Sequence, residues 1–211
     1  MERLDRKKDG PILLSNKKGG WKMKILWDFD GTLFDTYPGY AKMIKKVFKG
    51  EQLPEDIYSL LKVSFGHAFK ELALSKEQID EVHKLERALE PKDFMPFPGV
   101  KKVLESAELN VIMTHKYREG VVDILKANNM DQYFTELVAL DDGYPRKPDP
   151  ESYRYLHNKY GIDLVVGDRE LDIIPGKSIG AKTCLFQSKA PGADYYINDY
   201  EEFFDVVQLN R

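Results

Sequence analysis

The chain has 211 residues, of which 42% are apolar and 32% are charged, as in an ordinary globular protein with a buried core. Its net charge is only −3, from 32 basic against 35 acidic residues. We therefore expect neither a nucleic acid nor a membrane as partner, because no basic stripe runs along the chain and no apolar segment is long enough to span a bilayer. These features do not indicate an oligomeric state.

Residues 1–22 are basic and interrupted by glycine and proline, and their apolar run is too short for the core of a signal peptide. Gly19-Gly20 can be encoded by GGAGG, a ribosome-binding sequence, shortly upstream of Met23. We therefore interpret Met23 as the natural start and residues 1–22 as a translated leader or a tail.

From Met23 onward, short apolar runs typical of β-strands alternate with amphipathic stretches of helical length. The predicted strands are 24–29, 110–113, 137–140, 164–166, 183–186 and 195–197. The helices predicted between and after them are 100–107, 119–128, 150–160, 172–180 and 201–207. This alternation predicts an α/β fold with a largely parallel sheet, in which ligands collect at the carboxyl ends of the strands.

The long interval between the first two predicted strands has little β character. Its predicted helices are 40–49, 57–63, 68–74 and 76–89, the last with Ser75 and Gln78 at the spacing of a capping box. We interpret residues 37–94 as a small all-helical insert above the carboxyl end of the first strand. Residues 23–36 and 95–211 then form the α/β core.

Four motifs at predicted strand ends carry residues suited to phosphoryl transfer. Together they supply four carboxylates, one hydroxyl and one lysine, from Asp28, Asp30, Thr114, Lys147, Asp168 and Asp172. A carboxylate can attack phosphorus, a second acid can move the proton, and Mg²⁺ prefers oxygen ligands. A lysine and a hydroxyl can hold the transferring phosphoryl oxygens. Each residue alone has a simpler explanation; Asp172, for example, could cap the helix in which it lies.

The set resembles the haloacid dehalogenase-like phosphohydrolases, in the branch that contains phosphoglycolate phosphatase-like enzymes. The matching segments, in the order of that family, are DFDGTLFDT (28–36), VIMTHK (111–116), RKPDP (146–150) and VVGDRELDIIPGKSIGAKT (165–183). The resemblance implies a Rossmann-like parallel sheet of order 5-4-1-2-3. It also implies that the helical insert is a cap that closes over the substrate.

The resemblance further implies a role for each matched residue. Asp28 is then the nucleophile, Asp30 the general acid and base, and Thr114 and Lys147 the groups that bind the phosphoryl oxygens. The implied Mg²⁺ ligands are Asp28, the main-chain carbonyl of Asp30 and Asp168, with Asp172 as a further ligand or as an acid that contacts a ligand. Members of the family that cleave carbon–halogen bonds generally lack the second aspartate, so Asp30 favours a phosphatase.

Four further residues are candidates for substrate contacts. Tyr37 follows the first motif, His115 follows Thr114, and His67 and Lys70 lie in the segment 64–72 of the insert. For His67 and Lys70, solvent-exposed positions on a helix are an equally good interpretation.

The single cysteine, Cys184, lies in an apolar stretch, which favours an inert buried thiol and a reducing compartment. We therefore expect a cytoplasmic, Mg²⁺-dependent phosphatase that hydrolyses a small phosphorylated metabolite through an aspartyl-phosphate intermediate. A phosphomutase of the same superfamily and a non-catalytic regulatory member are the alternatives. The sequence leaves phosphoglycolate, sugar phosphates, nucleotides and pyrophosphate open as substrates.

Overall fold

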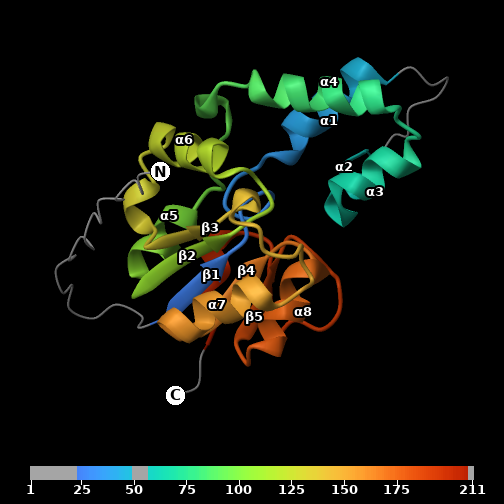
Figure 1. The fold of residues 1–211 in the computed structure, drawn as a ribbon. Coiled ribbons are helices and arrows are strands. Elements are labelled where there is room, and N and C mark those ends of the chain that lie inside the picture. Colours follow the sequence, from blue (N-terminus) through green and yellow to red (C-terminus); the bar gives the residue numbers. More distant parts are fainter. Residues whose placement is uncertain (1–22, 49–56, 209–211) are drawn as a thin grey trace, which may run out of the picture.

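The computed structural model of the chain describes residues 23–48 and 57–208, so the leader predicted at 1–22 lies outside the described residues. The described residues form one parallel sheet with the strand order β3-β2-β1-β4-β5-β6 (Figure 1). The strands are β1 (Lys24–Trp27), β2 (Leu109–Met113), β3 (Glu136–Val138), β4 (Leu164–Gly167), β5 (Lys182–Phe186) and β6 (Tyr195–Ile197). The expected order 5-4-1-2-3 is this order counted from the opposite edge, and β6 extends it. The Rossmann-like α/β fold is therefore confirmed.

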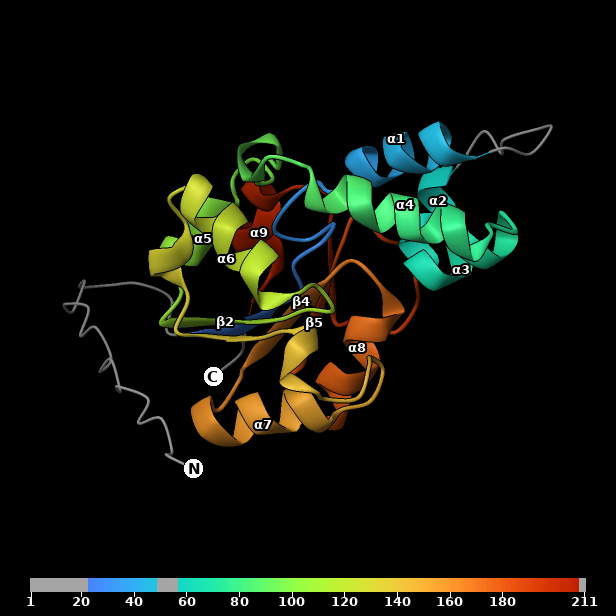
Figure 2. The same cartoon turned by 45° about the horizontal axis from the view of Figure 1, so that its top comes forward.

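Helices cover both faces of the sheet, because its central strands are apolar on both sides. Ile25 and Trp27 of β1 belong to one core cluster, whereas Leu26 belongs to the cluster on the opposite face. Figure 2 shows α5, α6 and α9 on one side and α7 and α8 on the other. These helices are α5 (Val100–Ser106), α6 (Arg118–Ala127), α7 (Glu151–Tyr160), α8 (Glu170–Ser178) and α9 (Phe203–Val206). None of the helices within 23–48 and 57–208 has the length and apolar character that a membrane crossing requires.

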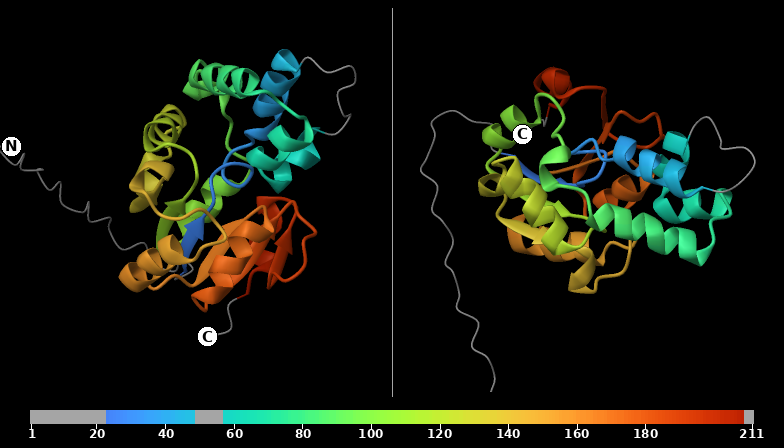
Figure 3. Two further views of the ribbon diagram at one scale, coloured as in Figure 1. Left: turned by 45° about the vertical axis from the view of Figure 1, so that its right-hand side comes forward. Right: turned by 90° about the horizontal axis from the view of Figure 1, so that it is seen from above.

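Between β1 and α5 the chain forms the helical insert, which stands over one end of the sheet (Figure 3). Its helices are α1 (Tyr37–Val47), α2 (Ile57–Val63), α3 (Phe65–Glu71) and α4 (Lys76–Arg87). They share an apolar core of their own, which includes Ile44, Leu61 and Val82. The predicted capping box starts α4, where the side chains of Ser75 and Gln78 each accept a hydrogen bond from the other's backbone N–H. The boundaries at 37 and 94, and the role of the insert as a cap, stay predictions.

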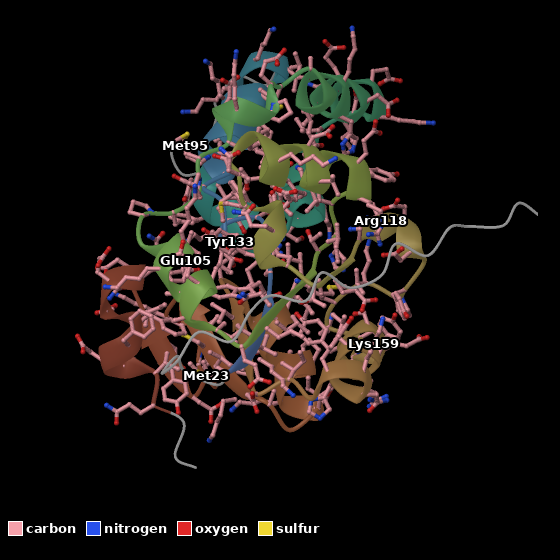
Figure 4. The ribbon with its side chains drawn as sticks, turned by 90° about the vertical axis from the view of Figure 1, so that its left-hand side faces the viewer. Met23, Met95, Glu105, Arg118, Tyr133 and Lys159 are labelled. Carbon is pink, nitrogen blue, oxygen red and sulfur yellow. The ribbon has the colours of Figure 1, made fainter. Side chains whose placement is uncertain are left out.

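The two segments that join the insert to the core lie antiparallel to each other. The N–H of Asp35 donates to the carbonyl of Met95 (3.1 Å), and the N–H of Phe97 donates to that of Leu33 (3.0 Å). Figure 4 shows Met95 where the chain returns from the insert, well above Met23 at the start of β1. The insert is therefore attached through two paired segments, not through two independent linkers.

Several predicted elements differ from the structure in extent; the helices predicted at 68–74 and 172–180, for example, are α3 (Phe65–Glu71) and α8 (Glu170–Ser178). Three other differences concern the ends of two strands and the last helix. The first strand ends at Trp27 instead of residue 29, so Asp28 lies just beyond it. The strand predicted at 137–140 ends at Val138, because the Asp142 carboxylate accepts the Ala139 N–H (2.8 Å) and turns the chain into a short 3₁₀ helix. The helix predicted at 201–207 is divided between a 3₁₀ turn and α9. The 3₁₀ helices are Pro91–Asp93, Asp131–Tyr133, Leu140–Asp142 and Tyr200–Glu202.

Candidate active site

The four motifs meet at the carboxyl ends of the central strands, which are adjacent in the sheet. Asp28 follows β1, Thr114 follows β2 and Asp168 follows β4. Backbone pairing continues one residue past two of these strands. The N–H of Asp28 donates to the carbonyl of Val166 (2.9 Å), and the N–H of Thr114 donates to the carbonyl of Val138 (3.0 Å). The sheet itself thus positions the start of three motifs, whereas the Lys147 motif lies in the loop before α7.

Three carboxylates lie together in this place. One carboxylate oxygen from each of Asp28, Asp168 and Asp172 lies within 4.8 Å of the other two, and all three residues are buried. Like charges this close are unfavourable in a buried site unless cations compensate them. Burial raises the pKa of Asp168; the nearby Arg169 lowers it, and the charges of Asp28 and Asp172 raise it further.

The same three residues fit a divalent cation. Oδ2 of Asp28 and Oδ1 of Asp168 are buried without a hydrogen-bond partner among the described residues. Carboxylate oxygens are the ligands that hard divalent cations prefer, and a cation here would satisfy both atoms. The carboxylate of Asp30 is not part of this group, and a ligand role for its main-chain carbonyl stays a prediction.

Lys147 supplies a buried positive charge to the carboxylates. Its Nζ donates to Oδ1 of Asp28 (2.7 Å) and to Oδ1 of Asp172 (2.6 Å), and the Tyr153 hydroxyl also donates to Asp172 (3.3 Å). Burial by itself lowers the pKa of the ammonium, but the two carboxylates outweigh burial and raise it above its ordinary value. Lys147 is therefore charged and held at the predicted nucleophile.

Arg169 is a second cation at the site, and we did not predict a role for it. Its Nη2 lies 3.6 Å from Oδ2 of Asp28 and its Nε lies 3.3 Å from Oδ1 of Asp168. The residue stands inside the fourth motif, directly after Asp168. However, the sequence pattern does not indicate that its side chain turns back over the carboxylates.

Two glycines allow the carboxylates to approach the backbone. Gly31 has a φ of +74°, and a Cβ there would lie 2.3 Å from Cε2 of Tyr37 and 2.7 Å from Oδ2 of Asp168. A Cβ on Gly167 would lie 2.4 Å from Cβ of Asp172. Any larger residue at either position would displace a side chain of the site.

Of the four candidates for substrate contacts, two are placed within the site. The Tyr37 hydroxyl donates to Oδ2 of Asp168 (2.7 Å), so this side chain supports a predicted metal ligand. Nε2 of His115 accepts the backbone N–H of Lys147 (3.0 Å). Burial and then the charges of Lys147, Arg146 and Arg169 lower the pKa of His115 to about 3, so the ring is neutral and positions the loop of Lys147.

The other two candidates lie apart from the motifs. His67 is near the start of α3, where its backbone N–H donates to the Ser64 side chain (2.9 Å), and Lys70 is exposed. Within residues 23–48 and 57–208, neither side chain forms a hydrogen bond or an ion pair with the four motifs. A role in substrate binding stays a prediction for both.

Comparison with known proteins gives a consistent set of similarities. The model of the haloacid dehalogenase-like hydrolase family matches residues 25–186. Pyrophosphatase PpaX of Bacillus velezensis is 30% identical over 207 residues, covering 88% of this chain and 94% of its own. Pyrophosphatase PpaX of Halalkalibacterium halodurans is 29% identical over 187 residues, covering 81% and 86%. The crystal structure of a hydrolase from Streptococcus pneumoniae is 31% identical, covers 79% of this chain and 94% of its own, and has a TM-score of 0.61.

Proposed function

Because this chain belongs to the haloacid dehalogenase-like hydrolase family and is a phosphohydrolase, we propose that it hydrolyses a small phosphorylated metabolite with Mg²⁺, through an aspartyl-phosphate on Asp28. The observation that carries this proposal is the buried group of Asp28, Asp168 and Asp172, with Lys147 bonded to two of its members. A reactive carboxylate beside a buried cation matches the requirements of attack on a phosphoryl group.

The proposed reaction has two half-reactions. In the first, a carboxylate oxygen of Asp28 attacks phosphorus, the bond to the leaving oxygen breaks, and Asp30 gives that oxygen its proton. In the second, Asp30 takes a proton from water, and the water oxygen attacks phosphorus. Inorganic phosphate leaves, and the carboxylate of Asp28 is restored.

The other residues bind and orient in this proposal. Asp28, Asp168, Asp172 and the main-chain carbonyl of Asp30 would hold Mg²⁺, which supplies positive charge for the phosphoryl group when it is bound. Lys147 would hold phosphoryl oxygens from its position at Asp28. The Thr114 hydroxyl accepts the N–H of Lys116 (3.2 Å), which leaves its own hydrogen available for a phosphoryl oxygen.

The substrate and the cell compartment are the finer parts of the proposal. The relatives named pyrophosphatase PpaX support inorganic pyrophosphate as the first compound to test. The insert at 37–94 would act as the cap that closes over the substrate. The buried free thiol of Cys184 supports a cytoplasmic location.

The deciding experiment is a panel of pyrophosphate, phosphoglycolate, sugar phosphates and nucleotides, assayed for released phosphate with Mg²⁺ and with EDTA. We expect turnover only with metal, and a loss of at least about 10³-fold in Asp28→Asn. Asp35→Asn, which changes an exposed aspartate a few residues further on, is the matched control and should keep its activity. Acid-quenched wild type should carry one phosphate on the peptide that contains Asp28.

Three results would contradict the proposal. Undiminished turnover by Asp28→Asn excludes Asp28 as nucleophile, and undiminished turnover in EDTA excludes the metal. An isomerised sugar phosphate in place of free phosphate would identify a mutase.

A further inference from the structure

A second buried polar cluster lies beside the carboxylates and connects the core to the insert. Nζ of Lys116, on the loop after β2, donates to the Tyr40 hydroxyl (2.5 Å) and to Oε1 of Glu86 (2.8 Å). Tyr40 belongs to α1 and Glu86 to α4, and the Tyr40 hydroxyl donates to the same Glu86 oxygen. Two helices of the insert therefore hold one ammonium group of the core.

The same ammonium group faces Asp30. Nζ of Lys116 lies 3.8 Å from Oδ1 of Asp30, and this oxygen is buried with no hydrogen-bond partner among the described residues. The rings of Tyr40 and Phe94 flank the ammonium at 5.1 and 5.6 Å. Burial alone lowers the pKa of Lys116, but the charges of Asp30 and Glu86 outweigh burial, so the group is a cation shared between two carboxylates.

The backbone of Lys116 is fixed independently of the insert. Its N–H donates to Oγ1 of Thr114 (3.2 Å), and its carbonyl accepts the N–H of Leu140 (3.0 Å). Only the flexible side chain can therefore respond when Glu86 and Tyr40 change position.

We propose that Lys116 is a positioning residue for Asp30, and that Glu86 and Tyr40 of the insert set its distance from that carboxylate. The proposal rests on the proposed function, since it takes Asp30 as the acid that protonates the leaving oxygen. At 3.8 Å the ammonium attracts and orients the carboxylate without occupying a lone pair in a hydrogen bond. If Glu86 were lost, the ammonium would pair directly with Asp30 and draw its side chain away from the leaving oxygen.

The dependence of the rate on the leaving group tests this role. A 4-nitrophenolate leaves without a proton, whereas phenolate and alkoxide leaving groups need one from the general acid. In Lys116→Met, which keeps the apolar stem, we expect kcat/KM for phenyl phosphate to fall about 10–100-fold and that for 4-nitrophenyl phosphate to change by less than about 3-fold. Glu86→Gln should also lower kcat/KM for phenyl phosphate more than kcat/KM for 4-nitrophenyl phosphate.

Matched controls are available on α4, the helix that carries Glu86. Lys84 and Glu81 form an ion pair of 3.3 Å on α4, with side chains that are 72% and 45% exposed. Lys84→Met and Glu81→Gln remove the same charges at the surface and should leave both substrates unaffected. Urea unfolding of every variant separates a loss of fold from a loss of positioning. Glu86→Gln also provides the test if Lys116→Met does not fold.

The outcomes separate this inference from the proposed function. Equal losses for both esters in Lys116→Met and Glu86→Gln, or no loss, would overturn the role of Lys116. If Asp30→Asn shows the unequal loss and the other two variants do not, the inference fails and the proposed function stands. If Asp28→Asn retains its turnover, the proposed function fails as well.

Discussion

His115 is expected to make the stability of the fold depend on pH. The unfolded imidazole has an ordinary pKa of 6.5, whereas the folded ring has a pKa lowered to about 3 by burial and by the neighbouring cations. A lowered folded pKa means that protons bind the unfolded state preferentially. The contribution of His115 to stability is therefore fully present above pH 6.5 and is lost as the pH falls toward the folded pKa.

The size of this loss in the free energy of unfolding depends only on protonation of the unfolded imidazole, as long as the folded ring stays neutral. At about pH 5 the linkage relation gives a loss of about 2 kcal/mol relative to about pH 8. Because the ring is only partly buried, solvent screening reduces this figure to about 1–2 kcal/mol.

The assay compares urea unfolding of the wild type and His115→Gln at both pH values, with EDTA present throughout. The glutamine side chain does not titrate, and its amide oxygen reaches the position of Nε2, which accepts the Lys147 N–H. The free energy of unfolding of the wild type, minus that of the variant, should fall by about 1–2 kcal/mol from about pH 8 to about pH 5. His115→Asn is the control, because it is also non-titrating but too short to reach Lys147. An unchanged difference between wild type and His115→Gln would refute the reasoning.

Two further predictions concern buried positions. Gly31→Ala should lower the free energy of unfolding by at least about 2 kcal/mol and reduce turnover, because an alanine at a φ of +74° is strained and its methyl group would overlap Tyr37 and Asp168. Gly39→Ala, which meets nothing within 4 Å, is its control, and equal urea midpoints for the two variants would contradict the prediction. Cys184 is buried and its thiol pKa is raised by that burial, so a chromogenic disulfide should label the thiol only after unfolding in urea. Stoichiometric labelling of the folded protein would show that the thiol is accessible.

The sequence predicted most of the elements because local composition determines them. An apolar run such as 24–27 must be buried on both faces, and the polar cluster after it marks the end of the strand. The segment 57–63 was predicted as a helix from its local pattern, and it is α2. The order of the strands was not predicted from local composition. That prediction came from the resemblance to a family and not from periodicity.

Predictions were least accurate where a side chain interrupts a regular pattern. The apolar residues at 137–140 predict a strand to their end, but the bond from Ala139 N–H to Asp142 stops it earlier. A substrate contact by His115 stays a prediction, and the bond from the Lys147 N–H to its ring is a contact that the sequence did not indicate. In both cases the deciding contact depends on the direction of one side chain.

The sequence by itself determined the α/β fold class and brought Asp28, Asp30 and Asp168 to strand ends, since strand spacing and glycine turns act over a few residues. Only the tertiary structure decided that Arg169 turns back over the carboxylates and that Lys116 lies between Asp30 and Glu86. Helices α1, α2 and α3 lie between Asp30 and Glu86 in the chain, and no local period relates the two positions. The physical reason is that a buried ammonium group is stable only beside carboxylates. Which carboxylates lie beside it depends on how the insert packs against the core, and not on the local sequence.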